Sequence, residues 1–319
     1  MQSLTPARIK TLAGVYFGYG LSILLRRPIV ISPPSFITVE PVCGCNLQCP
    51  ECPVGIGELG RRTGMIELDV VDSILESFGR RAIWVNLYFQ GEPFLHPKLH
   101  EIVERFSAQR IFTSVSTNGQ LLTPEIVDKI LLTGLKEIIF SVDGASEEEY
   151  LAYRRGGSFQ TVVENIRLVV AKRKGRGTFF PRIVYQTLVT SANENNLDNI
   201  RAFALKLGVD TVDFKTLNLH HGVDSNNLLP STSKLSRYTQ VKTKRERSNA
   251  CFRLWSNAVI SFDGRLALCC MDKEVAIFKN IYDMSLFEAW KSVYFNRIRN
   301  MLLSSELSWL CENCSLKTR

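Results

Sequence analysis

The 319-residue sequence has no cysteine between Cys52 and Cys251, although it contains nine cysteines in all. They form two groups, one from Cys43 to Cys52 and one from Cys251 to Cys314. A disulfide framework would spread its cysteines more evenly along the chain. The distribution therefore favours two metal sites and a reducing, cytoplasmic setting over a disulfide-bonded secreted protein.

The sequence also lacks an apolar run long enough to cross a membrane. The apolar segment from Leu12 to Leu25 is interrupted by Ser22 and falls short of the roughly 20 residues that a bilayer requires. No small-residue cleavage site follows it, which argues against a signal peptide. Basic residues flank the segment, so it predicts either a helix packed outside the fold, which we favour, or a membrane-surface helix.

Charge of one sign forms no long tract in the chain. The formal net charge is +8, and the basic runs at 172–176 and 242–247 are short. A nucleic-acid surface would be expected to interleave aromatic residues with such cations. We therefore expect no nucleic-acid partner and interpret both runs as solvated helix ends or linkers.

Apolar segments typical of strands alternate with amphipathic segments typical of helices between residues 35 and 217. This alternation predicts parallel strands joined by right-handed crossovers, in either a doubly wound sheet or a barrel. The predicted strands are 35–42, 82–89, 111–116, 137–142, 182–189 and 209–217, and the predicted helices are 66–80, 97–108, 124–132, 159–172 and 197–207.

Polar segments follow four consecutive predicted strands, and their position favours the barrel. They are Cys45–Cys52, Gly91–Pro93, Thr117–Gly119 and Asp143–Gly144. In a barrel the carboxyl ends of the strands meet at one mouth, where all four segments would face one ligand. We therefore predict an α/β fold, a partial (β/α)6 TIM-like barrel over residues 35–217.

The remaining sequence predicts three further parts. Residues 1–34 form a lead-in with the apolar helix, and the polar stretch 218–249 is a linker or an insertion over the barrel mouth. Residues 250–319 form a small α+β extension, in which Asp263-Gly264 predicts a hairpin and 285–303 a helix.

Three cysteines share one short loop after the first predicted strand, with the spacing Cys45-x3-Cys49-x2-Cys52. Thiolates are soft ligands that select zinc, copper(I) or iron-sulfur clusters. Closed sites usually take four protein ligands, so three leave one metal position open to a small molecule. A structural zinc knuckle or a disulfide pair is the alternative, and Cys43 is an additional thiol.

This spacing resembles the signature of the radical S-adenosylmethionine (radical SAM) enzymes. In that family three cysteines hold a [4Fe-4S] cluster, and S-adenosyl-L-methionine chelates the fourth iron. Reductive cleavage then gives a 5′-deoxyadenosyl radical that abstracts hydrogen. The resemblance implies both cofactors and an electron donor such as flavodoxin or ferredoxin.

The strand-end segments resemble the later motifs of the same family. Gly91-Glu92-Pro93 resembles the segment that binds the amino group of S-adenosylmethionine, where glycine permits close approach and a carboxylate or carbonyls accept from an ammonium. The family has further motifs that contact the ribose and methionine parts of S-adenosylmethionine, and an arginine that pairs with its carboxylate. The resemblance therefore implies a further set of cofactor-binding residues. These are Ser116, Thr117, Asn118, Ser141, Asp143 and Arg154.

The sequence departs from the family pattern at two positions. Gln90 stands where the family usually has a second glycine. Glu51 stands where an aromatic residue commonly packs on adenine, so adenine stacking by this residue is not expected. Arg155 is the alternative to Arg154 as the carboxylate partner.

The second cysteine group resembles the SPASM and shorter twitch domains attached to radical SAM barrels. Those domains bind auxiliary [4Fe-4S] clusters, and a cluster with four protein ligands suits electron transfer. The implied ligands are Cys251, Cys269, Cys311 and Cys314, with Cys270 left over. A zinc ribbon is the alternative because zinc takes the same four thiolates.

Together these features predict a radical SAM oxidoreductase or maturase that abstracts hydrogen from a peptide or small-molecule substrate. The alternatives are a dehydrogenase of a small alcohol or sugar, an enzyme acting on a membrane lipid or glycan precursor, and a non-catalytic iron-sulfur carrier or zinc scaffold. No catalytic base is assigned. The candidates on or near the expected mouth are Asp213, Lys215, His220, His221 and Asp272.

Overall fold

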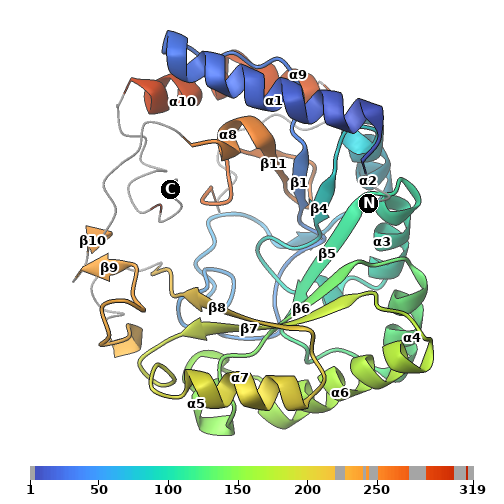
Figure 1. The fold of residues 1–319 in the computed structure, drawn as a ribbon, viewed down its shortest axis with the longest axis vertical. Coiled ribbons are helices and arrows are strands. Elements are labelled where there is room, and N and C mark those ends of the chain that lie inside the picture. The colour runs from blue at the N-terminus through green and yellow to red at the C-terminus, as the bar shows by residue number, and fades with distance from the viewer. Residues whose placement is uncertain are drawn as a thin grey trace.

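The computed structural model describes residues 4–219, 227–239, 242–243, 251–272, 285–304 and 314. Within these ranges the centre of the fold is a curved parallel sheet flanked by helices (Figure 1). Its parallel strands, in spatial order, are β1 (Phe36–Val39), β4 (Trp84–Asn86), β5 (Phe112–Thr117), β6 (Glu137–Ser141), β7 (Arg182–Val189) and β8 (Thr211–Thr216). The predicted partial barrel is confirmed.

Helices connect successive strands and bury their apolar faces against the sheet. They are α2 (Leu68–Ile74) with its π-helical continuation η1 (Leu75–Gly79), α3 (Leu99–Ala108), α4 (Pro124–Leu132), α5 (Glu147–Tyr153), α6 (Phe159–Gly175) and α7 (Leu197–Lys206). Phe78, Phe106 and Ile166 pack with the strand residues Val85 and Ile138 in one fully buried core. This burial fixes the strand ends, which position the loops of the mouth.

Two helical segments differ from the sequence expectation. Helix α5 was not predicted, because its seven residues begin with three glutamates and show no apolar stripe. The predicted helix 285–303 was wrong as a single helix, since the structure has α9 (Leu286–Lys291) and α10 (Val293–Leu303). The break falls at Ser292, whose backbone is extended and whose Oγ caps α10 by accepting from the Phe295 amide.

The C-terminal extension continues the barrel sheet. After the short α8 (Arg253–Ser256), strand β11 (Asn257–Ile260) pairs in parallel with β1, and β12 (Leu266–Ala267) pairs antiparallel with β11. The predicted Asp263-Gly264 turn joins them, with Gly264 at φ 77°. Strand β1 is therefore an interior strand, hydrogen-bonded on one side to the barrel and on the other to the extension.

Two small antiparallel pairs lie outside the main sheet. One is formed by β2 (Val42–Cys43) and β3 (Gly64–Met65), which enclose the cysteine loop between them. The other is formed by β9 (Tyr238–Thr239) and β10 (Lys242–Thr243) in the region predicted as a linker. A short 3-10 helix, η2 (Pro93–Leu95), precedes α3.

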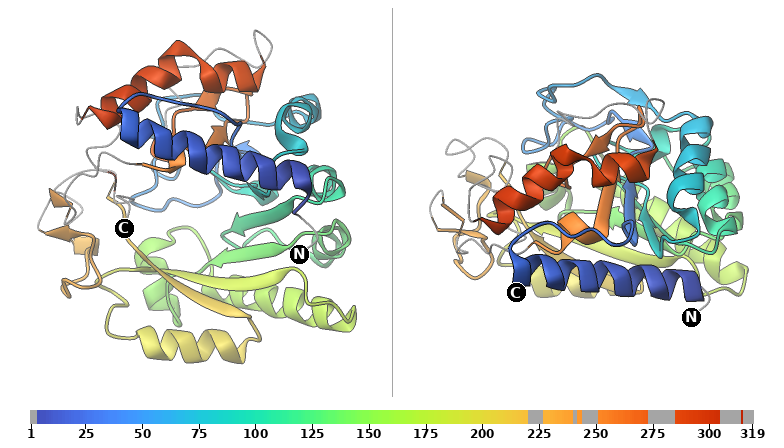
Figure 2. Two further views of the ribbon diagram at one scale, coloured as in Figure 1. Left: turned by 45° about the horizontal axis from the view of Figure 1, so that its top comes forward. Right: turned by 90° about the horizontal axis from the view of Figure 1, so that it is seen from above.

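Helix α1 (Pro6–Leu25) packs on the outside of the fold, alongside α8 (Figures 1 and 2). The Arg8 guanidinium donates to the carbonyls of Gln109 and Arg110, at 2.7 and 2.9 Å. Near the other end, the Trp255 indole donates to Ser22 Oγ at 3.1 Å. No helix in the described ranges has both the length and the apolar content that crossing a bilayer would take.

The segment 227–239 is held against the loop that follows β7. The Glu194 carboxylate accepts from the amide and the hydroxyl of Ser231, both at 2.8 Å, and from the Thr232 amide at 2.9 Å. Burial alone would raise the pKa of Glu194, but these donors outweigh it and lower the pKa to about 2.

We predict that acid releases this segment. Because the folded pKa lies below the ordinary 4.5, the carboxylate stabilises the contact above pH 4.5, and this stabilisation is lost as the pH falls towards 2. Hydrogen exchange at Ser231 and Thr232, corrected for intrinsic rates, should accelerate over that range. In a Glu194→Gln variant exchange should already be fast at neutral pH, and equal protection in both proteins would contradict the prediction.

Candidate cofactor site at the barrel mouth

The carboxyl ends of the barrel strands surround a cavity of about 480 Å³. Three of the four strand-end segments predicted from the sequence contribute to its wall, and in place of the fourth, Asp143–Gly144, the end of β6 contributes Ser141. The predicted residues that line it are Cys45, Cys49, Cys52, Gly91, Glu92, Ser116, Thr117, Asn118, Ser141 and Arg154. Pro93 and Asp143 are buried beside it.

The cysteine loop presents its three free thiols to this cavity. Cys49 is buried, Cys45 and Cys52 are half-buried, and all three pack with the apolar residues Leu47 and Tyr153. The Gln48 amide donates to the Arg155 carbonyl at 2.9 Å, which ties the loop to the turn after α5. Cys43 is fully buried in β2 and does not line the cavity.

The donor set fits an iron-sulfur cluster better than a single metal ion. Among the described residues, no group of three or more Cys, His, Asp or Glu side chains is gathered to hold one ion. A cluster instead takes its thiolates on different iron atoms, so its ligands stand apart. Burial raises the pKa of Cys49 to about 11 and also raises that of Cys45, so a bound cation is needed to displace the protons.

Gly91 packs directly against the backbone that leads into the cysteine loop. Its φ is 131°, and an added Cβ would lie 2.5 Å from the Val42 carbonyl oxygen and 2.6 Å from that of Gly44. The next amide, of Glu92, donates to the Gly44 carbonyl at 2.8 Å. From the sequence we predicted that Gly91 lets a ligand approach the backbone closely. The structure shows that the contact between this segment and the cysteine loop also requires glycine at position 91.

The Glu92 carboxylate is almost fully buried and already satisfied by the protein. Thr117 Oγ1 and the Asn118 amide donate to it, both at 2.7 Å, and the Phe94 amide donates at 3.0 Å. Burial raises its pKa despite these donors. Acceptors for a ligand ammonium would therefore be backbone carbonyls of this segment, while the carboxylate joins it to the end of β5.

The residues at the ends of β5 and β6 connect the cavity wall to the cysteine loop. The Asn118 amide group donates to Asn46 Oδ1 at 2.8 Å and lies 3.8 Å from Cys45 Sγ. The hydroxyls of Ser116 and Ser141 lie 3.4 Å apart on neighbouring strands. These two hydroxyls are available to a polar ligand at the centre of the mouth.

Arg154 extends into the cavity on a buried carboxylate support. Its Nε donates to Asp143 Oδ2 at 2.6 Å, and its Nη1 lies 4.0 Å from Cys49 Sγ. Asp143 is fixed in turn, because the Leu188 amide donates to its Oδ1 at 2.7 Å. Burial alone would lower the pKa of Arg154, but Asp143 raises it above the ordinary value, so the guanidinium stays charged. The alternative, Arg155, is exposed.

Other lining residues were not identified from the sequence as cofactor residues. Arg237 reaches the cavity from the region predicted as a linker or an insertion over the barrel mouth, and donates to the hydroxyl and carbonyl of Thr216 at 2.9 and 2.7 Å. Glu51, the departure from the family pattern, also lines the cavity and is buried. Further lining residues are Tyr88, Gln90, Gln186 and Lys215.

The two candidate bases on β8 form a pair, since Lys215 Nζ lies 2.7 Å from Asp213 Oδ2. Asp272 is buried and accepts from the Leu268 amide at 2.9 Å. His220 and His221 lie outside the described residues. Among the candidates that the structure describes, none is singled out as a base.

A second cavity, of about 250 Å³, lies between the barrel and the extension. Cys269 and Cys270 line it, and it shares Tyr88, Phe89 and Gln90 with the first cavity. Cys251, Cys269, Cys270 and Cys314 are free thiols, whereas the predicted ligand Cys311 lies outside the described residues. Two cysteines of the second group, Cys269 and Cys270, therefore line a cavity that adjoins the mouth.

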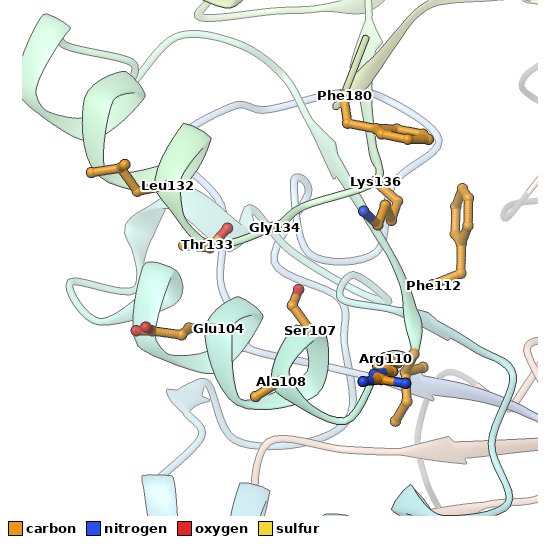
Figure 3. Close-up of a pocket in the computed structure, with 11 residues that line it drawn as sticks. Glu104, Ser107, Ala108, Arg110, Phe112, Leu132, Thr133, Gly134, Lys136 and Phe180 are labelled. Carbon is orange, nitrogen blue, oxygen red and sulfur yellow. The ribbon is translucent and has the colours of Figure 1, made fainter. Parts of the chain in front are cut away.

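A wider hollow of about 760 Å³ lies at the opposite end of the strands, before β5 and β6 (Figure 3). Figure 3 shows Lys136 beside Phe180, and the Lys136 ammonium lies 4.4 Å from the ring centroid. None of the cysteines that the structure describes lines this hollow. We therefore place the candidate site at the mouth.

Comparison with family models assigns both regions. Residues 39–185 match the radical SAM superfamily, and residues 251–315 match SPASM, an iron-sulfur cluster-binding domain. The first match contains the three-cysteine loop and strands β4 to β6. The second contains all four predicted auxiliary ligands.

Several curated proteins are similar to this chain. The tungsten-containing aldehyde ferredoxin oxidoreductase cofactor-modifying protein of Pyrococcus furiosus is 24% identical over 318 residues, covering 88% of this chain and 87% of that protein. The PqqA peptide cyclase of Gluconobacter oxydans is 25% identical over 316 residues, covering 90% and 84%. The mycofactocin maturase MftC of Mycobacterium tuberculosis is 26% identical over 178 residues, covering 56% of this chain and 44% of that protein.

Solved structures show the same fold. SuiB of Streptococcus suis, bound to its precursor peptide SuiA, matches with a TM-score of 0.64 and 13% identity, covering 85% of this chain and 67% of that one.

We predict that Gly91→Ala disrupts the cysteine loop. The added methyl must displace the backbone of Val42 or Gly44, at an expected cost of about 2–4 kcal/mol in the free energy of unfolding. The amount of iron bound after anaerobic reconstitution should fall together with the stability. Both are measurable, by thermal denaturation and by iron analysis.

Gly57→Ala is the matched control, because Gly57 also has a positive φ, 75°, but an added Cβ would meet open space. That change should cost about 1 kcal/mol and leave iron content intact. Wild-type iron content and melting temperature in Gly91→Ala would refute the proposed contact.

Proposed function

Because the chain belongs to the radical SAM superfamily and carries a SPASM-type extension, we propose that it is a maturase that modifies a peptide. The observation that carries the proposal is the convergence of the three thiols, the Ser116 and Ser141 hydroxyls and Arg154 on one cavity. This set offers ligands for a cluster and polar partners for a sulfonium amino acid in the same space.

The barrel cofactors would be held by residues from successive strand ends. Cys45, Cys49 and Cys52 would hold a [4Fe-4S] cluster, and S-adenosylmethionine would lie against 91–93 and the two hydroxyls. When bound, these two cofactors supply hydrogen-abstracting radical chemistry. The protein orients the ligand, since Arg154 offers a charged donor to its carboxylate while Asp143 fixes the guanidinium.

The cavity wall also limits access of water to the cofactors. Leu47, Tyr153 and Leu217 form a buried apolar cluster around the thiols. Excluding water strengthens the pairing of Arg154 with a carboxylate and protects a reactive species from side reactions.

A peptide substrate is proposed on the basis of the relatives and the second cavity. The PqqA peptide cyclase aligns over most of both chains, and its name states a peptide substrate. In this chain the second cavity adjoins the mouth and offers Asn86, Arg253 and Asn257 as hydrogen-bonding groups. Such groups suit the carbonyls and side chains of an extended peptide.

The extension would supply an electron path. Cys251, Cys269, Cys311 and Cys314 would hold an auxiliary [4Fe-4S] cluster, for which a closed four-thiolate site favours electron transfer. An oxidative outcome would use that cluster as the electron acceptor, and a ferredoxin or flavodoxin would reduce the barrel cluster.

Asp143 and Pro93 are proposed as supports of the cofactor site at the barrel mouth.

The first test is reductive cleavage of S-adenosylmethionine. Protein reconstituted without oxygen and treated with dithionite should release 5′-deoxyadenosine, which chromatography detects. Cys49→Ala should abolish this product, whereas Cys314→Ala should retain it, and each variant should lose about half of the iron. Absence of 5′-deoxyadenosine from the iron-loaded wild type would overturn the proposed activity.

The second test separates Arg154 from its neighbour. Arg154→Gln removes a buried charged donor worth about 1.5–3 kcal/mol, so the Kd for S-adenosylmethionine should rise about 10- to 100-fold. Arg155→Gln should change it less than about twofold, because that side chain is exposed. Equal effects of the two substitutions, measured by calorimetry, would remove Arg154 from the cofactor site.

A further inference from the structure

On α1, polar and small residues face the protein and large apolar residues face outward, which is the reverse of the usual pattern of an amphipathic helix. The face turned to the protein consists mainly of polar or small residues, namely Arg8, Thr11, Val15, Gly18 and Ser22. The outward face carries large apolar side chains, with Tyr16 58% exposed, Phe17 65% and Leu24 76%. A helix that serves only to cover a core places its apolar residues inward.

The inward polar residues are explained by their contacts. The Arg8 guanidinium donates to backbone carbonyls at the ends of η1 and α3, and Ser22 Oγ accepts from the Ile29 amide and the Trp255 indole. At Gly18 an added Cβ would lie 2.8 Å from the Ile29 carbonyl oxygen. Packing thus determines the inner face of α1, while only part of the outer face, such as the stacking of Tyr16 on Phe252, is used within the fold.

The outward face forms an apolar groove with a basic border. The groove, of about 930 Å³, is lined by residues that include Tyr16, Phe17, Leu24, Ile31 and Lys10. Arg26 and Arg27 are exposed at the end of the helix. The sequence from residue 1 to 39 contains no aspartate or glutamate.

We propose that α1 docks the protein on the surface of an anionic lipid bilayer. Aromatic and aliphatic side chains on one face, bordered by cations and free of acidic residues, match the acyl boundary and the phosphate layer of such a surface. The helix runs along the outside of the molecule, so its whole length can lie in the plane of the interface (Figure 2).

This docking fixes the orientation of the barrel. The α1 contacts at Gly79, Gln109, Arg110 and Trp255 all lie just before the first residues of β4, β5 and β11. The mouth is at the other ends of the strands, so it faces away from the lipid. A membrane-bound enzyme of this form takes its substrate from the aqueous side, and its substrate is not itself a bilayer lipid.

The test is co-sedimentation of the full chain with vesicles. The protein should bind vesicles of phosphatidylcholine with phosphatidylserine, bind pure phosphatidylcholine at least about tenfold more weakly, and dissociate as salt increases. A Phe17→Glu/Leu24→Glu variant should lose at least about tenfold in binding. The control is Leu205→Glu, which changes an apolar residue, 53% exposed, on α7 at the far side of the molecule (Figure 1); it should bind like the wild type.

Thermal denaturation and 5′-deoxyadenosine release confirm that each variant is folded. Equal binding to both kinds of vesicle, or undiminished binding of the Phe17→Glu/Leu24→Glu variant, would overturn the proposal. The proposal would also be overturned if the protein bound no vesicles and formed a dimer that the Phe17→Glu/Leu24→Glu substitution converts to monomer. In that case the groove would bind a second copy of the chain.

Discussion

The buried ion pair between Glu40 and Arg61 determines how the parts of the mouth meet. Both guanidinium Nη atoms donate to the carboxylate, at 2.7 and 2.5 Å, and both side chains are almost fully buried. The same carboxylate accepts from the Gln90 amide at 3.2 Å and from the Phe262 amide at 3.3 Å. One side chain at the end of β1 thus joins four segments: β1, the return of the cysteine loop, the loop after β4 and the hairpin of the extension. Such a pair contributes little net stability, but removing one partner costs about 3–5 kcal/mol, so it favours this arrangement over alternatives.

Three acidic residues at the mouth, Glu40, Glu92 and Asp143, act mainly on the protein itself. Glu92 joins the segment after β4 to the end of β5, and Asp143 supports Arg154. Because these carboxylates and that of Glu40 are bound by protein donors, the groups that the cavity offers to a ligand are mainly thiols, hydroxyls and guanidinium groups, beside Glu51. That division suits an iron-sulfur cluster held by the thiols, because the carboxylates fix its surroundings through hydrogen bonds rather than competing for its metal.

The sequence allowed the barrel, the hairpin and the meeting of the strand-end segments to be predicted. Those features follow from local patterns, namely apolar periodicity, turn residues and the position of polar segments after strands. The directions of individual side chains could not be predicted in the same way. The carboxylates of Glu92 and Asp143 could accept hydrogen bonds from a ligand. Instead they accept from Thr117 and Arg154, which belong to other elements of the fold. The contribution of Arg237 depends on residues 227–239 folding back onto β8; the polar composition allowed an insertion over the mouth, but it did not single out the residue that reaches the cavity.

The pairing of β11 with β1 bears on how the two cysteine groups could work together. The first group directly follows β1, while Cys251 precedes β11 and Cys269 follows β12. The first group and the cysteines Cys251, Cys269 and Cys270 of the second are therefore attached to adjacent strands of one hydrogen-bonded sheet. Electron transfer between two bound clusters depends on a constant separation, and a shared sheet maintains one better than a flexible linker would. The Glu40 bond to Phe262 adds a second connection between the same parts, at the edge of the cavity where a substrate would lie. The fold thus places the extension beside the mouth, where it forms a wall of the second cavity, and a change that separated β11 from β1 would alter cofactor binding and substrate access together.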